Sequence, residues 1–154
     1  MDMEILKIGS EILKKKTKKV EKLTPEIKEI IKEMKKTMTQ AGGVGLAANQ
    51  VGLNLSIFIA NWKGKFYTFI NPEIVKKSKN IILLEEACLS VPDKLGIVPR
   101  HTWVVVKGRN QSWKEKTVKA KGILSQIFQH EIDHLNGILY IEKAQQIFEI
   151  NEKN

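Results

Sequence analysis

The sequence predicts a single domain of mixed helix and strand, and three observations lead to that prediction. Apolar residues recur at helical spacing near both ends, over residues 24–40 and 122–136. The middle of the chain holds short apolar or alternating runs punctuated by Gly, Asn and Pro, as strands joined by turns do. The length suits one domain with its own core, residues 1–154, ending in a short C-terminal tail.

The composition is that of a soluble globular protein, with 42% apolar and 28% charged residues. The formal net charge is +9, and every basic residue except Arg100 and Arg109 is lysine. Dedicated nucleic-acid readers rely on arginine and on aromatic platforms, so we expect no specific nucleic-acid partner. A lysine-rich surface still leaves open a weak attraction to a polyanion such as the ribosome.

Cys88 is the only cysteine, which excludes a disulfide within the chain. The N-terminus has no apolar run of signal-peptide length, and no stretch is apolar for long enough to cross a membrane. We therefore expect a cytoplasmic protein with no membrane partner.

The first elements are an arm and a helix. Residues 4–8 suit either a short strand or a packed arm, and the charged residues 14–22 suit a solvated surface segment. A helix start follows, with Thr24 as the N-cap and Pro25 at the first helical position. The helix is expected to end near Gln40, with an apolar face made of Ile27, Ile30, Ile31, Met34 and Met38.

A glycine-rich loop comes next, at residues 42–45. Its glycines allow positive φ and a close approach of the backbone to another group, but the loop lacks the Gly-Lys-Ser/Thr ending of a phosphate loop. The apolar residues 46–48 indicate that it leads into buried chain. Gln50 follows, and a buried amide needs hydrogen-bond partners, one of which a substrate could supply.

Five strands are predicted in the middle of the chain, at residues 55–60, 66–70, 81–84, 103–107 and 113–119. The first two are joined by a hairpin connection at 61–65 and the last two by one at 108–111. Asn71-Pro72 is expected to end the second strand.

The segment between the two hairpins holds the lone cysteine. In an extended chain Glu86, Cys88 and Ser90 would share one face. A single cysteine is more often inert and buried than functional. The final helix nevertheless gives Cys88 a second interpretation.

That helix carries His130, Glu131 and His134 in the order H-E-x-x-H. Residues four apart lie on one face of a helix, so both imidazoles can reach one metal ion. Glu131 lies one residue round, within reach of a proton on a metal-bound water. On a helical projection Ser125, Gln129, Asp133 and Asn136 share the polar half. The histidines lie at the edge of the apolar half, and Glu131 lies within it, where an unpartnered carboxylate is costly.

Such a site needs a third ligand. In zinc peptidases with H-E-x-x-H it is a downstream His or Glu. No His follows His134, and Glu142 and Glu149 have no suggestive context. Cys88 is the better candidate, because its thiolate would complete a His₂Cys site with one position open for water.

Three stretches together resemble the peptide deformylase family. Its first motif, G-x-G-L-A-A-x-Q, matches residues 43–50, and its third, Q-H-E-x-D-H, matches residues 129–134. Its second, E-G-C-L-S, matches residues 86–90 except that Ala87 stands where the family has Gly. The motifs occur in the family's order, and the similarity covers essentially the whole chain.

The resemblance implies an α+β fold with antiparallel β-sheets packed around a central metal-binding helix. It implies a metal-dependent amidase that hydrolyses the N-formyl group from the formyl-methionine of nascent polypeptides and releases formate. It assigns the metal to Cys88, His130 and His134, with Fe²⁺ in the cell and Zn²⁺, Ni²⁺ or Co²⁺ as substitutes.

The resemblance also implies catalytic and substrate-binding roles. Glu131 would act as general base and then as acid for the departing amine. The Gln50 side-chain amide and the Leu89 backbone N–H would stabilise the oxyanion, and the Gly45 backbone would hold the peptide. An apolar pocket for the methionine side chain would be lined by Val44, Leu84, Ile123, Ile127 and His130, with Gln126 at its edge.

Ala87 is the main departure from the family pattern. Its methyl group would clash if the backbone needs a glycine conformation, or would narrow the substrate cleft. The chain stops soon after residues 140–142, so we expect no long C-terminal helix of the kind that many bacterial members carry. We also expect a monomer.

Two rival functions are distinguishable by experiment. A zinc peptidase of the H-E-x-x-H type would cleave internal peptide bonds and keep its metal after Cys88→Ser. A deformylase-like binding module would hold N-termini without turnover, so Glu131→Gln would change no activity. Neither rival needs the glycine loop with Gln50, so the sequence favours the deformylase.

Overall fold

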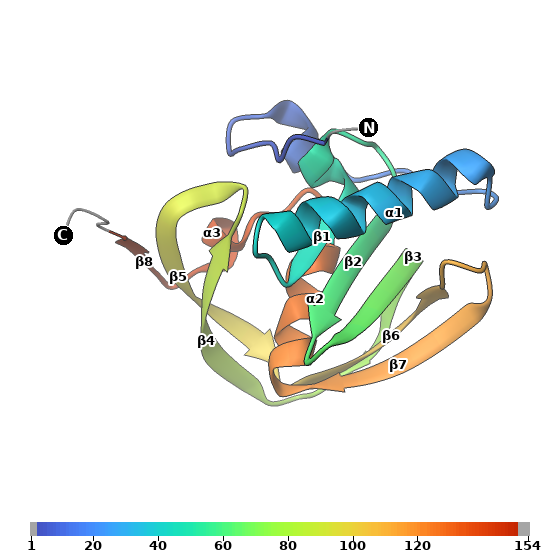
Figure 1. The fold of residues 1–154 in the computed structure, drawn as a ribbon. Coiled ribbons are helices and arrows are strands. Elements are labelled where there is room, and N and C mark those ends of the chain that lie inside the picture. The colour runs from blue at the N-terminus through green and yellow to red at the C-terminus, as the bar shows by residue number, and fades with distance from the viewer. Residues whose placement is uncertain (1–2, 151–154) are drawn as a thin grey trace.

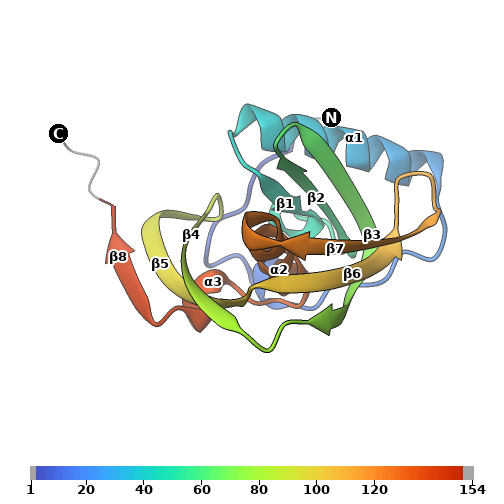
Figure 2. The same ribbon diagram turned by 90° about the horizontal axis from the view of Figure 1, so that it is seen from below.

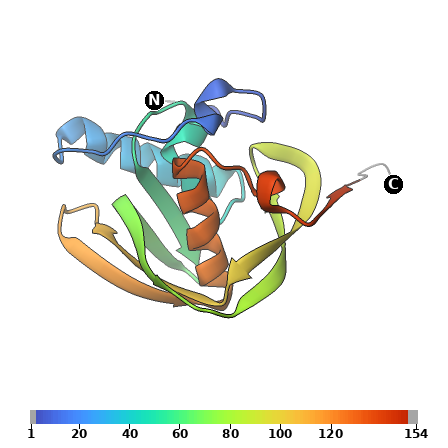
Figure 3. The ribbon, with the colours of Figure 1, turned by 180° about the vertical axis from the view of Figure 1, so that it is seen from behind.

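The structure is a computed structural model that describes residues 3–150, and over these residues two antiparallel sheets enclose one central helix, α2 (Gly122–Leu135) (Figure 1). The larger sheet has the strand order β1-β2-β3-β6-β7, and the smaller has the order β4-β5-β8. Figure 3 shows α2 standing between them. The predicted α+β class with antiparallel sheets around the metal-motif helix is confirmed.

The larger sheet consists of β1 (Gly45–Ala47), β2 (Ile57–Trp62), β3 (Lys65–Lys77), β6 (Trp103–Arg109) and β7 (Glu115–Lys121). The smaller sheet consists of β4 (Ile81–Cys88), β5 (Val91–His101) and β8 (Gln146–Glu149). Besides α2, the helical elements are η1 (Glu11–Lys14), α1 (Pro25–Gln40), η2 (Ala48–Val51) and α3 (Tyr140–Lys143). In Figure 2, β8 lies at the outer edge of the smaller sheet, beside β5.

Helix α1 begins where the sequence places it. The Thr24 side chain accepts a hydrogen bond from the Ile27 N–H at 3.1 Å, and Pro25 opens the first turn without needing a donor. All five predicted apolar residues of this helix are buried. They pack against one face of the larger sheet, where Ile57 and Ile59 point.

The other face of the larger sheet packs on α2. Successive residues of a strand point to opposite faces, so Phe58 and Ala60 face α2 while their neighbours face α1. Phe128 is the centre of this second layer, with its ring edge-on to Phe58 at a centroid separation of 5.5 Å. The sheet therefore has helices on both faces, and α2 is held in the interior.

Helix α2 is buried on its polar half as well as on its apolar half. Ser125, Gln129 and Asp133 are all buried, because β5 runs alongside and offers polar partners. The Ser125 hydroxyl and the Gln129 amide donate to the His101 carbonyl at 3.0 and 2.9 Å. A helical projection distinguishes the polar half of a helix from its apolar half, but it does not show whether another element covers the polar half.

The strand after Asn71-Pro72 corrects a prediction. The pair does not end β3, which continues to Lys77 across a register shift between Ile70 and Glu73. Asn71 adopts a left-handed conformation with φ 55°, and its side chain binds both backbone groups of Val20, each at 2.8 Å. Asn71-Pro72 looks like a strand end in the sequence, but in the structure it forms a bulge, and the strand continues beyond it.

The N-terminal residues form a packed arm rather than a strand. The Leu6 N–H donates to the Gln50 carbonyl, and the Ile8 N–H donates to the Ser90 carbonyl, both at 2.7 Å. The arm thus ties η2 to the turn that follows β4. Among the described residues, no helix combines the length and apolar character that crossing a membrane requires.

Candidate metal centre and active site

Three side chains with metal-ligand chemistry converge from two elements. Cys88 ends β4, and His130 and His134 lie one turn apart on α2. Cys88 Sγ lies 3.2 Å from His134 Nε2, which lies 3.1 Å from His130 Nε2. The three ligand atoms are all within 4.8 Å of one another. A thiol and two imidazoles at this separation fit one divalent ion with a further position open.

The position of Cys88 depends on an irregularity in β4. The pairing with β5 shifts register between Glu86 and Cys88, and the chain then turns back so that Cys88 pairs with Val91. A bulge bends a strand and re-aims the side chains beside it. It lets Glu86 be buried beside α2 while Cys88 reaches the same histidine pair.

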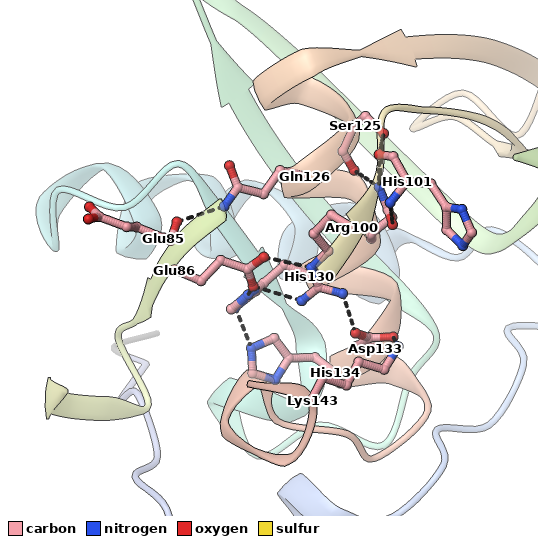
Figure 4. A network of polar contacts seen from close by, with 11 residues as sticks. Glu85, Glu86, Arg100, His101, Ser125, Gln126, His130, Asp133, His134 and Lys143 are labelled. Carbon is pink, nitrogen blue, oxygen red and sulfur yellow. Dashed lines mark hydrogen bonds and ion pairs between the residues drawn. The ribbon is translucent and has the colours of Figure 1, made fainter. Parts of the chain in front are cut away.

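A chain of ion pairs runs from His130 to the surface (Figure 4). The His130 Nδ1–H donates to Glu86 Oε1 at 2.8 Å, and Arg100 holds both oxygens of Glu86 at 2.6 and 2.7 Å. Arg100 also donates to Asp133 Oδ2 at 2.6 Å, and Lys143 donates to Asp133 Oδ1 at 2.9 Å. An outer carboxylate of this kind orients a ligating imidazole and fixes its tautomer.

The charges of the network determine how its members titrate. Burial alone would raise the pKa of Glu86, but hydrogen bonds from Arg100 and His130 lower it to about 2. Burial would lower the pKa of His130, yet its bonds to Cys88 and Glu86 hold it well above the usual value. Burial and the neighbouring His130 charge depress the pKa of His134. The two histidines of the same helix face are therefore shifted in opposite directions by their surroundings.

Glu131 is the buried carboxyl group of the site. Within residues 3–150 its Oε1 has no hydrogen-bond partner, and burial raises its pKa to about 7. A carboxyl group that is uncharged or charged with nearly equal ease at neutral pH is suited to proton transfer. The backbone of Gly45 lies directly against this carboxyl group, so the strand β1 fixes its position.

Gln50 lies on η2 with its amide orientation fixed. Its Oε1 accepts from the Ala47 N–H at 2.9 Å, which directs Nε2 towards the cysteine. Nε2 donates to Ser90 Oγ at 3.0 Å and lies 3.6 Å from Cys88 Sγ. The buried amide therefore presents donors beside the metal ligands.

A cavity of about 410 Å³ opens beside these groups. Of the residues predicted for the site, those that line it are Val44, Gly45, Gln50, Cys88, Leu89, Ile123, Ile127, His130 and Glu131. His134 lies behind them among the metal ligands. Leu84 is not among the residues that line the cavity, and its contact with the methionine side chain stays a prediction. Gln126 Nε2 donates to the Glu85 carbonyl at 2.8 Å, and both of these residues line the cavity. Leu84 lies immediately before Glu85 on β4.

Ala87 lines the same cavity with an exposed methyl group. Its φ is not among the positive values found for non-glycine residues in the described chain, so its backbone needs no glycine. The expected backbone clash is therefore absent, and the methyl group acts only on the space within the cleft.

Sequence reasoning missed the residues behind the ligands. Arg100, fully buried at 2% exposure, was given no role, although it is one of only two arginines in a lysine-rich chain. Asp133 lies within the third motif, but a helical projection shows it only as a residue of the polar half. The scarcity of arginine was the one signal that could have drawn attention to Arg100, since arginine suits buried bidentate pairing better than lysine.

Comparison with known proteins agrees with this geometry. The family model described as polypeptide deformylase matches residues 2–149. The chain belongs to the peptide deformylase family. This deformylase is 50% identical over 115 residues to a peptide deformylase of Halothermothrix orenii, covering 73% of this chain and 74% of that one. It is 43% identical over 116 residues to one of Syntrophobacter fumaroxidans, covering 72% and 68%.

Solved structures show the same relationship. The crystal structure of peptide deformylase from Thermotoga maritima matches with a TM-score of 0.92 at 34% identity, covering 95% of this chain and 99% of that one. A peptide deformylase from Synechococcus elongatus in complex with actinonin matches with a TM-score of 0.91 at 30% identity, covering 94% and 79%. The deformylase described here is thus a metal-dependent hydrolase that removes the N-formyl group from the formyl-methionine of nascent polypeptides.

Proposed function

We propose that Cys88 Sγ, His130 Nε2 and His134 Nε2 hold the catalytic metal of this deformylase, and that Glu131 transfers the proton. The observation that carries the proposal is the meeting of three ligand atoms and one unpartnered buried carboxyl group beside a single cavity. When bound, the metal lowers the pKa of a water molecule and polarises the formyl oxygen.

Glu131 takes a proton from the attacking water and returns it to the nitrogen of the departing amine. Its pKa of about 7 suits both steps, because the group must accept a proton and then lose it. The C–N bond of the formamide breaks as the amine accepts the proton, and formate leaves with the oxygen of the water. The second proton of the water stays on the carboxyl product, and it is lost when that formic acid ionises to formate, so Glu131 ends the cycle in the protonation state in which it began.

Gln50 and Leu89 stabilise the oxyanion in this proposal. The Ala47 N–H already holds the Gln50 amide in one orientation, so only an Nε2 hydrogen that now faces Ser90 Oγ or Cys88 Sγ has to turn to the formyl oxygen as charge develops there. Leu89 lies in the turn after Cys88 and lines the same cavity, where its backbone N–H is the second proposed donor.

The methionine side chain occupies the apolar part of the cavity, beside Val44, Ile123 and Ile127. Val44 and Ile123 are 47% and 42% exposed, so their apolar side chains are accessible from the cavity that they line. The Gly45 backbone holds the peptide across the cleft from β4. Fe²⁺ is the proposed native ion, with Zn²⁺, Ni²⁺ or Co²⁺ as functional substitutes.

The proposed setting is the cytoplasm, with the enzyme acting as a monomer on emerging chains. The net charge of +9 supports a weak attraction of the lysine-rich surface to the ribosome. A fall in ribosome co-sedimentation with rising salt would support this, and salt-insensitive co-sedimentation would contradict it.

Formate release from formyl-Met-Ala-Ser, with metal content measured on the same anaerobic sample, tests the function and the ion together. We expect activity in proportion to Fe²⁺ content, and inhibition by actinonin. Cys88→Ser should lose both metal and activity. A protein that keeps its metal after this change and cleaves internal peptide bonds would instead be a zinc peptidase.

Glu131→Gln separates the proton-transfer role from metal binding. The amide matches the carboxyl group in size, so the variant should bind metal as the wild type does and lose activity by about 10²–10⁴-fold. Wild-type activity in Glu131→Gln would refute the role of Glu131. Absence of turnover in the fully loaded wild type would favour a binding module.

A further inference from the structure

The short helix α3 sends two of its four residues towards the metal centre. It follows α2 after a brief turn, and its first residue, Tyr140, and last residue, Lys143, reach His130 by separate routes. The routes differ in chemistry, one being an aromatic contact and the other a chain of ion pairs.

Tyr140 lies between the two elements that carry the metal ligands. It is 1% exposed, and its ring stacks on that of His130 with centroids 5.9 Å apart and an interplanar angle of 27°. Cys88 packs against the same small apolar cluster, which Tyr140 forms with Val91, Val98 and Leu139. One aromatic ring therefore contacts His130 on α2 and belongs to the cluster against which Cys88 on β4 packs.

Several contacts hold that ring in place. The Tyr140 hydroxyl donates to the Lys94 carbonyl at 3.1 Å. The ring lies on β5 at Gly96, where an added Cβ would come within 2.8 Å of Tyr140 Cε2, so only glycine allows the approach. Glu142 caps the helix by accepting from the Leu139 N–H at 2.8 Å. The position of the ring is thus fixed by the hydroxyl's hydrogen bond, by the packing of the ring on Gly96 and by the capped helix that carries it.

The second route ends on Lys143. Its amine donates to Asp133, whose other oxygen binds Arg100, and Arg100 in turn holds the Glu86 carboxylate that accepts from His130. The Lys143 side chain is 42% exposed, so solvent weakens this pairing. We therefore expect Tyr140 to contribute more than Lys143 to holding His130 in position.

We propose that α3 positions the metal centre, with Tyr140 as the positioning residue that fixes His130 relative to Cys88. The proposal rests on the metal-binding role given above to these two side chains. Loss of the ring removes no metal ligand, but it allows the His130 imidazole and the end of β4 with Cys88 to move apart. The metal should then dissociate faster.

The test compares Tyr140→Ala, Tyr140→Leu and Tyr140→Phe in cobalt-loaded protein, by the rate of transfer of Co²⁺ to a chelator. Tyr140→Ala and Tyr140→Leu should release Co²⁺ about tenfold faster or more, as changes behind metal ligands do. Tyr140→Phe keeps the ring and should stay within about twofold. The absorption bands of Co²⁺ should shift in the first two variants and not in the third.

Met34→Ala is the matched control, since Met34 is fully buried in the α1 layer, in a cluster that contains no residue of α2. It should lower the melting temperature of the metal-free protein while leaving the Co²⁺ release rate near that of the wild type. Release at the wild-type rate from both Tyr140→Ala and Tyr140→Leu would overturn the positioning role, as would equally fast release from Met34→Ala. A wild-type cobalt spectrum unchanged by Cys88→Ser would overturn the metal assignment itself.

Discussion

Gly45 and Glu131 are in direct contact across the junction of β1 with α2. A methyl group at Gly45 would come within 2.8 Å of Glu131 Cδ, and closer still to one of its carboxylate oxygens. Neither position can change without the other moving, because Gly45 is paired with Ala60 in the sheet and Glu131 is buried in the helix.

Gly45→Ala should therefore displace the Glu131 carboxyl group. A shift of this size is expected to lower kcat by about 100-fold, since small misplacements of a reacting group are that costly. Metal content should be unchanged, because the ligands lie elsewhere. Val44→Ala is the control, from the same loop but with an exposed side chain, and should act on KM more than on kcat. Equal kcat in Gly45→Ala and the wild type would refute the contact's importance.

Substitutions at Gln50 and at its partner Ser90 should lower kcat to different extents. Gln50→Ala removes a proposed oxyanion donor and should lower kcat by about 10²–10³-fold. Ser90→Ala removes only one of the bonds that hold the amide, while the Ala47 N–H still fixes Oε1, so its loss should be much smaller. Steady-state kinetics on formyl-Met-Ala-Ser measure both. A larger defect in Ser90→Ala than in Gln50→Ala would mean that the hydroxyl, not the amide, matters.

Glu86 predicts how stability depends on pH. Its folded-state pKa of about 2 lies below the ordinary value of 4.5, so its contribution is complete above 4.5 and is lost as the pH falls towards 2. The contribution is on the order of 3 kcal/mol. Urea unfolding of the metal-free protein at about pH 6 and about pH 3 should show this loss in the wild type and much less in Glu86→Gln. The same loss in both proteins would contradict the assignment.

Ala87→Gly should change little in the fold. Ala87 has ordinary backbone angles within β4, so glycine adds only chain freedom and should lower stability by roughly 0.5–1 kcal/mol. Its methyl group narrows the cavity, so the variant should accept formyl-Met peptides with larger following residues more readily. Ratios of kcat/KM for formyl-Met-Ala-Ser and formyl-Met-Phe-Ser measure this. Unchanged ratios would mean that the methyl group does not face the peptide.

The parts of the site within one element could be predicted from sequence. His130 and His134 are four residues apart on a helix, so their common direction follows from helical geometry alone. The ligand chemistry of Cys88 and the family motif both indicate it as the third ligand, and in the structure it lies beside His134. What made this possible is that metal ligands belong to a small set of residue types.

Strand β5 could not be predicted in the same way. Its sequence contains Pro92, Gly96 and Pro99, which indicate turns when taken alone. In the sheet, β5 pairs with both neighbours only at residues 96–97, and both prolines lie outside that span. Proline is tolerated where one side of a strand has no partner, but the partner on each side is decided by the tertiary fold.

The buried network was equally beyond the sequence. Arg100 is buried because Glu86 and Asp133 meet it from two other elements, 14 and 33 residues away. An arginine that is solvated and one that is enclosed have the same local pattern, and only the assembled partners distinguish them. The same holds for the polar half of α2, which is covered because β5 lies alongside.

The pairing of Arg100 with two carboxylates also constrains how this sequence can change over time. Replacing Arg100 alone would leave buried Glu86 with only His130 and Asp133 with only Lys143 as partners, and replacing either acid alone would leave the arginine undercompensated, at a cost of about 3–5 kcal/mol. Each single substitution would thus remove a large part of the marginal stability of a typical domain before the second substitution arose. The three positions should therefore covary as one unit among relatives.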